Sequence, residues 1–479
     1  MAVESVPAGD GEHLLQDFLT AVHTAPPSHF LALVDRYAAQ IGLRRVALYL
    51  VDLQQRQLTP LDGGERLLVD ASPAGWAYRT LGLRVEESAG GPLTVWLPLV
   101  DGADRLGVAG MHVDALDSAL LRRCRTLVSV LSMAITSQRA VSDHLVQRAR
   151  TDTMTLPAEL VRSLLPPRTV GSAQAVSTAV LEPAYELGGD AFDHALTESA
   201  LHAVILDAMG HNLASGLTTS IAMAGCRSAR RMGAALPDLV KTVDEVLAEW
   251  LPEQYCTGIA ARLDLTSGVL TWCNCGHPAP LLIRDHQVLE KALERPGEPP
   301  MGMPAALGDA PRTVHRAALE PGDRVLLYTD GVTEARTAGG GRFGLAAFTD
   351  SIIRATAAGE LASEALRPDP HHLGEPGRET ERRRHDPAAR MAAARGALNR
   401  ARPAARRHIS LWIRFRSAVS PSSQITESRR RAAASARVSR SGLSRAMAGV
   451  TANRARMSSG RASSQATSPS VRRCRARER

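Results

Sequence analysis

Short apolar runs, each typical of a β-strand, constrain the fold of this chain most strongly, and they recur between residues 175 and 331. The runs read AVSTAVLEPA, LHAVILDAMG, TGIAARLDL, VLTWCNCGHPAPLLI and DRVLLYTDG. Two strongly helical segments, 213–233 and 236–251, lie between the second run and the third. Strands that surround a helical pair predict two packed sheets with helices outside them.

Aspartates stand at the ends of these predicted strands. Asp190 follows GluLeuGlyGly, Asp207 ends ValIleLeuAsp, and Asp330 ends LeuLeuTyrThrAsp. A single carboxylate at a strand end is usually a turn residue that hydrogen-bonds its own backbone. Three in this arrangement instead indicate a site for hard divalent cations such as Mg²⁺ or Mn²⁺, which prefer oxygen ligands. Two such ions bridged by a carboxylate can activate water for attack on phosphorus.

These aspartates belong to a series of motifs that resembles a known enzyme family. The motifs are ProAlaTyrGluLeuGlyGlyAsp (183–190), LeuAspAlaMetGlyHis (206–211), CysGlyHisProAlaProLeuLeu (275–282), ProGlyAspArgValLeuLeuTyrThrAspGlyValThrGluAla (321–335) and GlyArgPheGly (341–344). In this order they resemble the PPM phosphatases related to SpoIIE and RsbU. The resemblance implies an α+β domain, an αββα sandwich of two packed sheets flanked by helices.

The resemblance also implies roles for particular residues. Asp207 would bridge two Mn²⁺ or Mg²⁺ ions, with the Ala208 carbonyl as a neighbouring ligand. Asp190 would serve the second ion and Asp330 the first, so all three aspartates would be catalytic. The implied activity is that of a metal-dependent protein serine/threonine phosphatase. Its implied partner is a phosphorylated anti-sigma-factor antagonist of the STAS type.

Glycines beside these aspartates are expected to allow close backbone approach at the metal cleft, since they lack a Cβ atom: Gly188, Gly189 and Gly210. The family usually has another glycine where this chain has Asn212. Asn tolerates left-handed backbone angles better than other residues, so we expect the geometry to survive this substitution.

A CysXaaCysXaaHis run offers a different metal hypothesis. Cys273, Cys275 and His277 could be taken for zinc ligands. They lie in a predicted strand and turn without a second ligand pair, so the sequence disfavours zinc there.

The family's last motif, AspAspAlaThr followed by an apolar strand, is missing at the expected distance from Asp330. Residues 382–391 there read ArgArgArgHisAspProAlaAlaArgMet. One choice of codons, read one base later, gives AspAspAlaThrThrLeuLeuLeuGlyTrp, so we hypothesise a frameshift between about residues 365 and 382. Without the motif the domain is expected to lose a metal ligand and a central strand. A catalytically impaired pseudophosphatase that binds its partner is therefore the alternative function.

The N-terminal part shows a different pattern. Helical spacing near residues 13–41 precedes strand-like runs at 45–52, 93–101 and 104–114, the last two joined as a hairpin. A helical segment follows from residue 116 to about 150. This order resembles a GAF sensor domain, which implies an α+β fold that binds a small molecule or dimerises.

The predicted organisation has five parts. They are a disordered start (1–12), a GAF-like domain (13–138), a helical linker (139–165), the phosphatase-like domain (166–365) and an Arg/Ala/Ser-rich, disordered tail (366–479). A homodimer through the GAF-like domain and the linker helix is also expected.

Charge and cysteine content bear on partners and compartment. Residues 387–479 hold 22 arginines and 2 acidic residues, so the net charge of +8 divides into +20 there and −12 before it. An Arg-rich tail can attract nucleic acid, but Trp412 and Phe415 are its only aromatic residues, so nucleic-acid binding is disfavoured. Sparse cysteines and the lack of a long apolar run predict a cytoplasmic protein without a membrane span.

Overall fold

The computed structural model describes residues 8–87, 92–182, 184–186, 188–210, 212–303, 310–331, 344–357 and 408–415. The chain divides into two units, Met1–Ser417 and Ala418–Arg479, and the second unit lies outside the described residues.

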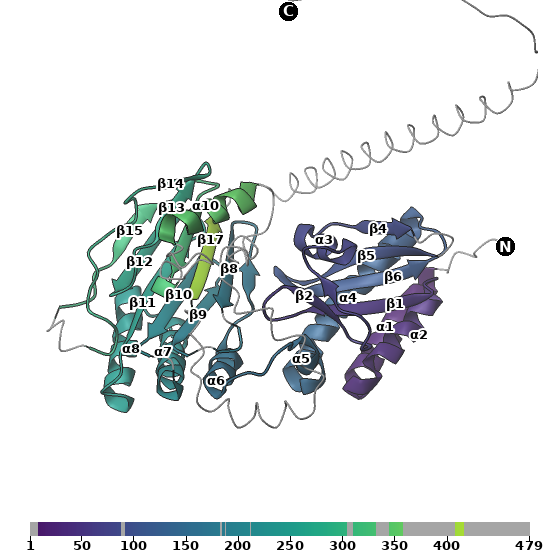
Figure 1. Cartoon of the computed structure of the whole chain (residues 1–479), viewed down its shortest axis with the longest axis horizontal. Coiled ribbons are helices and arrows are strands. Elements are labelled where there is room, and N and C mark those ends of the chain that lie inside the picture. The colour runs from purple at the N-terminus through teal and green to yellow at the C-terminus, as the bar shows by residue number, and fades with distance from the viewer. Residues whose placement is uncertain are drawn as a thin grey trace, which may run out of the picture. The chain divides into compact units, whose positions relative to one another are not determined.

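The first domain is built on one antiparallel sheet of six strands in the order β3-β2-β1-β6-β5-β4 (Figure 1). The strands are β1 (Arg45–Val51), β2 (Gln57–Pro60), β3 (Leu67–Leu68), β4 (Arg84–Glu87), β5 (Leu93–Asp101) and β6 (Asp104–Val113). The predicted hairpin is present, because β5 and β6 pair as far as Asp101 and Asp104, with a register shift between Leu99 and Val100. The three strands predicted for this region are therefore confirmed.

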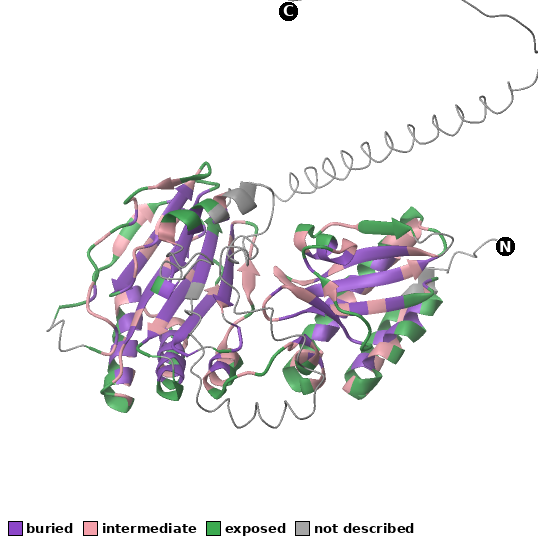
Figure 2. Ribbon diagram, in the orientation of Figure 1, coloured by how far each residue is buried: buried purple, intermediate pink, exposed green. Residues whose placement is uncertain are grey.

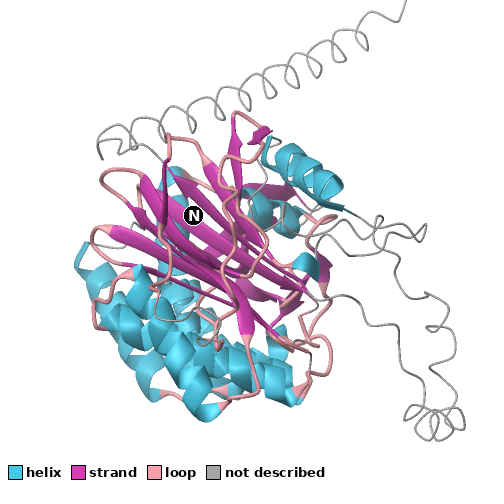
Figure 3. Ribbon diagram, turned by 90° about the vertical axis from the view of Figure 1, so that its left-hand side faces the viewer, coloured by secondary structure: helices cyan, strands magenta, loops and turns pink. Residues whose placement is uncertain are grey.

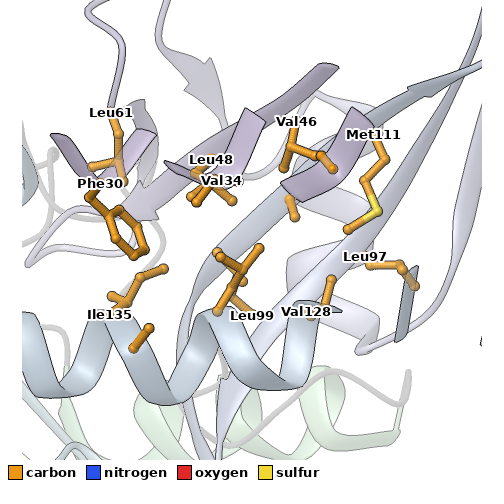
Figure 4. Packing of buried hydrophobic residues seen from close by; sticks show 14 of the residues in the cluster. Phe30, Val34, Val46, Leu48, Leu61, Leu97, Leu99, Met111, Val128 and Ile135 are labelled. Carbon is orange, nitrogen blue, oxygen red and sulfur yellow. The ribbon is translucent and has the colours of Figure 1, made fainter. Parts of the chain in front are cut away.

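Helices cover both faces of this sheet. On one face α1 (Ala8–Thr24), α2 (Phe30–Gln40) and α4 (Ser118–Val141) bury the larger core, preceded at α2 by the short helix η1 (Pro27–His29). Figure 4 shows part of this core: Phe30, Val34, Val46, Leu48, Leu61, Leu97, Leu99, Met111, Val128 and Ile135. Alternate strand residues face the other side, where α3 (Pro73–Thr80) packs over them. The domain is α+β as predicted, while its GAF-like identity stays a prediction.

The linker between the domains is not one helix. It contains the end of α4, then α5 (Asp143–Ala149) and α6 (Leu156–Leu164). New N-caps cause the breaks: the Ser142 hydroxyl accepts a hydrogen bond from the His144 amide, and Thr155 accepts one from Ala158. The prediction of a helical linker over 139–165 is therefore wrong in its continuity.

The second domain contains two stacked antiparallel sheets. The five-stranded sheet has the order β15-β12-β11-β10-β9 and the six-stranded sheet the order β14-β13-β16-β17-β8-β7. The strands are β7 (Thr169–Gly171), β8 (Ala175–Glu182), β9 (Asp190–Leu196), β10 (Ala200–Ala208), β11 (Cys256–Asp264), β12 (Val269–Cys275), β13 (Leu281–Arg284), β14 (Gln287–Leu289), β15 (His315–Ala318), β16 (Arg324–Tyr328) and β17 (His408–Phe415).

Helices lie outside the two sheets and make the domain an αββα sandwich (Figure 3). The innermost core joins the sheets through alternate residues such as Ile205, Ile259 and Leu327. The other face of the five-stranded sheet packs against α7 (Leu213–Arg231) and α8 (Leu236–Trp250), and α10 (Gly344–Ala357) covers the six-stranded sheet. Figure 2 shows the resulting burial along the strands. The predicted fold class is confirmed.

Strand β17 departs from the sequence prediction. It lies between β16 and β8, with Val325 opposite Ile413 and Ala179 opposite Leu411. Leu411 and Ile413 enter the core between the sheets, whereas Trp412 packs on the other face in the cluster with α10. Its alternating apolar side chains make it suitable for this central position. The expectation that the domain lacks a central strand is therefore wrong, and so is the prediction that the whole of 366–479 is a disordered tail. Residues 382–391, where the frameshift hypothesis places the missing motif, lie outside the described residues.

Candidate functional site

Two of the predicted aspartates lie directly opposite each other on neighbouring strands. Asp190 begins β9 and pairs in register with Asp207 near the end of β10. Ile205 points into the core between the two sheets, so the alternation along β10 points Asp207 the same way. Asp190 is 4% exposed and Asp207 is half-buried. The two carboxyl groups share a hydrogen bond.

The third aspartate comes from the opposite sheet. Asp330 follows β16 after the buried Thr329 and is itself exposed. Its carboxylate acts electrostatically on Asp207, so the structure brings all three predicted aspartates into one neighbourhood. They gather at one end of the sandwich, where strands from both sheets terminate.

The electrostatics of this cluster favour a cation. Burial, followed by the charge of Asp330, raises the pKa of Asp207 to about 6, while the hydrogen bond from Asp190 partly lowers it. Like charges that converge in a desolvated place resist ionisation unless positive charge compensates them. Carboxylate oxygens are the donors that Mg²⁺ and Mn²⁺ prefer, so the donor chemistry fits such ions.

The coordination geometry itself is not preformed. Within the part of the chain that the structure describes, no three His, Cys, Asp or Glu side chains are close enough to enclose one ion. Strand β17, which borders β16, contains no carboxylate in its sequence HisIleSerLeuTrpIleArgPhe. The ligand roles of Asp190, Asp207, Ala208 and Asp330 therefore stay predictions.

Backbone packing explains the glycine before Asp190. The Ala208 amide donates a hydrogen bond of 3.0 Å to the Gly189 carbonyl. A Cβ atom on Gly189 would come within 2.3 Å of the Ala208 carbonyl oxygen. Only glycine permits this approach, which holds the two carboxylate-bearing strand ends together.

The segment after Asp207 differs from its prediction in one residue. Gly210 has φ +89°, a left-handed conformation that suits glycine, and His211 lies outside the described residues. Asn212 has φ −104° and ψ −169°, so it is extended rather than left-handed. Its side chain accepts a hydrogen bond of 3.1 Å from the Ser215 amide and caps α7. Asn212 is therefore tolerated as an N-cap, and the explanation from left-handed angles is wrong.

The alternative zinc ligands point in different directions. Cys273 and Cys275 pack in the core against α7 and α8, where burial raises the pKa of the Cys273 thiol to about 12. His277 instead contacts Thr257, on the inner face of the same sheet. The three side chains do not converge on one position.

One polar neighbour of the aspartates escaped the sequence analysis. Thr257 on β11 lies directly opposite Asp207, on the side away from Asp190. Directly opposed residues share a face, so Asp190, Asp207 and Thr257 form a row across three strands. The pairing register of β10 with β11 would have identified Thr257 as a neighbour of Asp207, but the sequence alone does not give this register.

Comparisons with known proteins give a family match, a sequence relative and several similar solved structures. Residues 197–379 match the family "Stage II sporulation protein E (SpoIIE)". The phosphoserine phosphatase RsbP of Bacillus subtilis is 28% identical over 155 residues, which cover 31% of this chain and 37% of RsbP. The match thus spans well under half of that relative.

Solved structures are also similar. The RsbU and RsbW domains of a Mycobacterium tuberculosis protein give 23% identity and a TM-score of 0.38, over 51% of this chain and 62% of theirs. The phosphatase domain with a regulatory fragment of Bacillus subtilis SpoIIE gives 11% identity and a TM-score of 0.35, over 87% of this chain and all of that one. Residues 197–379 therefore contain a SpoIIE-type domain, and the second domain has the αββα sandwich that the resemblance to PPM phosphatases implies.

Proposed function

We propose that this chain is a metal-dependent phosphatase that removes phosphate from phosphoserine or phosphothreonine in a protein. The observation that carries this proposal is the convergence of Asp190, Asp207 and Asp330 at one end of the sandwich, within or beside the matched family region. When bound, two Mn²⁺ or Mg²⁺ ions would polarise the phosphate and supply a nucleophilic water.

The protein's own contribution would be to place ligands in a fixed array. Asp207 occupies the centre, flanked by Asp190 on its strand neighbour and by Asp330 from the opposite sheet. That position suits a bridging ligand between two ions, with the Ala208 carbonyl beside it. The hydrogen bond from Ala208 to Gly189 would keep these ligands at constant separation when substrate binds.

The partner in this proposal is a phosphorylated anti-sigma-factor antagonist of the STAS type. The relative RsbP bears the name phosphoserine phosphatase, which supports a phosphoserine substrate. The first domain, as a GAF-like sensor, would regulate the second and would form a homodimer together with the linker. A cytoplasmic location belongs to the same proposal; within the described ranges, no helix is long and apolar enough to cross a bilayer.

A catalytically impaired form is the second candidate. In the family that the motifs resemble, a ligand aspartate precedes the last strand, whereas residues 387–415, which include β17, contain no acidic residue. A domain with an incomplete ligand set would still bind the phosphorylated partner but turn it over slowly.

Hydrolysis of p-nitrophenyl phosphate with Mn²⁺ separates these functions. We expect the full chain to be active and Asp207→Asn to lower kcat/KM by about 10³-fold, since it removes the bridging charge. Glu249→Gln, an exposed carboxylate on α8, serves as the control and should leave the rate unchanged. A phosphoserine peptide should be hydrolysed faster than its phosphotyrosine counterpart.

The alternative makes a different prediction. If the full chain binds Mn²⁺ but is inactive, and a version with AspAspAlaThrThrLeuLeuLeuGlyTrp at 382–391 is active, this chain is a pseudophosphatase. Inactivity of all versions, together with Mn²⁺ binding that Asp207→Asn leaves intact, would contradict both functions.

A further inference from the structure

His277 occupies the connection between the two sheets of the second domain. It follows β12 of the five-stranded sheet and precedes β13 of the six-stranded sheet. Its side chain is buried, with 6% exposure. Asn274 fixes its backbone, because the Asn274 side chain donates to the His277 carbonyl and accepts from the His277 amide, both at 2.9 Å. The ring therefore projects from a rigid loop.

The ring of His277 interacts with residues of both sheets. Nδ1 lies 3.0 Å from the Thr257 hydroxyl on β11. The backbone of Tyr328 on β16 also acts on the ring, where it partly offsets the lowering of the His277 pKa by burial. Nε2 is buried and makes no hydrogen bond of normal geometry. A ring protonated on Nε2 can accept a hydrogen bond from the Thr257 hydroxyl at Nδ1.

Each of these neighbours leads to an aspartate of the candidate site. Thr257 is the register partner of Asp207 and shares its face of the sheet. Tyr328 is the last residue of β16, and Asp330 follows two residues later. His277 thus connects the strand beside Asp207 to the segment that carries Asp330 from the other sheet.

We propose that His277 is a positioning residue that, through Thr257 and Tyr328, sets the separation between Asp207 and Asp330 and thereby the affinity of the site for divalent cations. This inference rests on the proposed function. The carboxylates of Asp207 and Asp330 repel each other. Contacts within the protein must therefore hold the strand ends of the two sheets at a constant separation. Groups that orient metal ligands from behind typically contribute 10- to 100-fold to metal affinity.

The same domain contains a matched control. His194 on β9 is 3% exposed, and its Nδ1 lies 2.9 Å from the Ser177 hydroxyl on β8 of the other sheet. Its Nε2 lies 2.7 Å from the Pro167 carbonyl. His194 therefore also bridges the sheets through one hydroxyl and one carbonyl. It lies four residues along the strand from Asp190, roughly 13 Å at the usual rise per residue.

The test is Mn²⁺ titration calorimetry on the full chain, with the metal-free Tm of each variant measured in parallel. We expect His277→Gln and Thr257→Val to raise the Kd for Mn²⁺ by at least about tenfold, since each breaks the link to the strand beside Asp207. Thr257→Ser keeps the hydroxyl and should stay within about twofold of the wild type. His194→Gln and Ser177→Ala should lower Tm to a similar extent but leave Kd within about twofold.

Two results would overturn the inference while the proposed function stands. One is an unchanged Kd in His277→Gln and Thr257→Val although Asp207→Asn abolishes binding. The other is equal weakening in His194→Gln, which would mean general loosening of the sandwich. If His277→Gln does not fold, the Kd values of Thr257→Val and Thr257→Ser for Mn²⁺ are compared, and equal values overturn the inference. Absence of any Mn²⁺ binding that depends on Asp207 would overturn the proposed function and this inference together.

Discussion

At the residue scale, the most buried ion pair described in the second domain joins α8 to the chain before β15. Arg312 binds Asp244 with two nitrogens, at 2.8 Å from Nη2 and 3.2 Å from Nε, and the side chains are 2% and 5% exposed. Asp244 also accepts a hydrogen bond of 2.9 Å from the Gly302 amide. Removal of one partner leaves a buried charge without compensation, which is strongly destabilising.

We expect Asp244→Asn to lower the free energy of unfolding by about 3 kcal/mol, measured by urea denaturation at pH 7. The same helix provides a control in the exposed pair Lys241–Glu245, whose side chains are 71% and 64% exposed at a separation of 3.7 Å. Glu245→Gln should cost less than about 0.5 kcal/mol, because water screens this pair. Equal effects of the two substitutions would contradict the assignment of Asp244 as a buried anchor.

A second residue-scale prediction concerns acid stability. Burial lowers the pKa of His277 to about 4, whereas the unfolded chain has the ordinary value of 6.5. Between these values the unfolded state binds the extra proton, so the stability from neutral His277 is present above pH 6.5 and is lost as pH falls towards 4. The full loss is about 3 kcal/mol. Asp207 acts in the opposite sense without metal, because its raised pKa favours the protonated folded state as pH falls below about 6.

The comparison of wild type with His277→Gln isolates the histidine from these opposing groups. Urea denaturation with a chelator at several pH values from 7.5 to 4.5 should give a steeper acid loss for the wild type than for the variant. Parallel curves would show that folding does not lower the pKa of His277.

The site residues were predictable from their positions at strand ends. Buried polar residues whose hydrogen-bond partners are distant in the sequence were not. Asp190, Asp207 and Asp330 were chosen from strand-end positions, and the structure places them together. The strand that Asp190 begins was missed, because Asp193 and His194 make its sequence polar. Both are nevertheless buried. Asp193 accepts hydrogen bonds from arginines of α7, and the ring of His194 is hydrogen-bonded to Ser177 and Pro167. Only the folded chain shows these partners.

At the element scale, β17 is the strand that joins β16 to β8 within the six-stranded sheet. Loss of a central strand would leave both neighbours without their ladder hydrogen bonds and would open the core around Trp412, which is 2% exposed. We expect a chain that ends after Arg407 to lose the cooperative melting of the second domain. A chain that ends after Ser417 retains β17 and is the matched control. Thermal melts followed by circular dichroism compare the two, and identical melts would show that β17 does not stabilise the sheet.

Elements with clear periodicity were predicted well, and those defined by distant pairing were not. The alternation in β5, β6 and β10 and the helical spacing of α7 and α8 matched their predicted ranges closely. Strand β17 was missed because Arg-rich sequence surrounds its eight residues and its partners precede it by many residues. The breaks in the linker depend on single capping hydroxyls, at Ser142 and Thr155. One capping residue is a weak signal in a sequence that otherwise has helical periodicity.

At the scale of the whole chain, charge is divided unevenly along the sequence. Residues 418–479 contain 14 arginines and 2 glutamates, a net charge of +12, so residues 1–417 carry −4. Arginines that release counterions bind nucleic acid without sequence preference and with strong salt dependence. The candidate site and every strand of the described sheets precede residue 418. Nucleic-acid affinity and phosphatase activity should therefore be separable by one truncation.

We expect the chain that ends after Ser417 to keep its Mn²⁺-dependent kcat/KM within about twofold of the full chain. Its affinity for a short DNA duplex at 50 mM salt should fall at least about tenfold, because the positive segment is gone and the remainder is net negative. Fluorescence anisotropy of a labelled duplex measures this, and the full chain should lose most of its affinity at 200 mM salt. Salt-resistant binding, or binding that survives truncation, would instead point to a nucleic-acid surface in the folded domains. A large fall in kcat/KM would show that the basic segment acts on the phosphatase site, so that charge and catalysis are coupled in the intact chain.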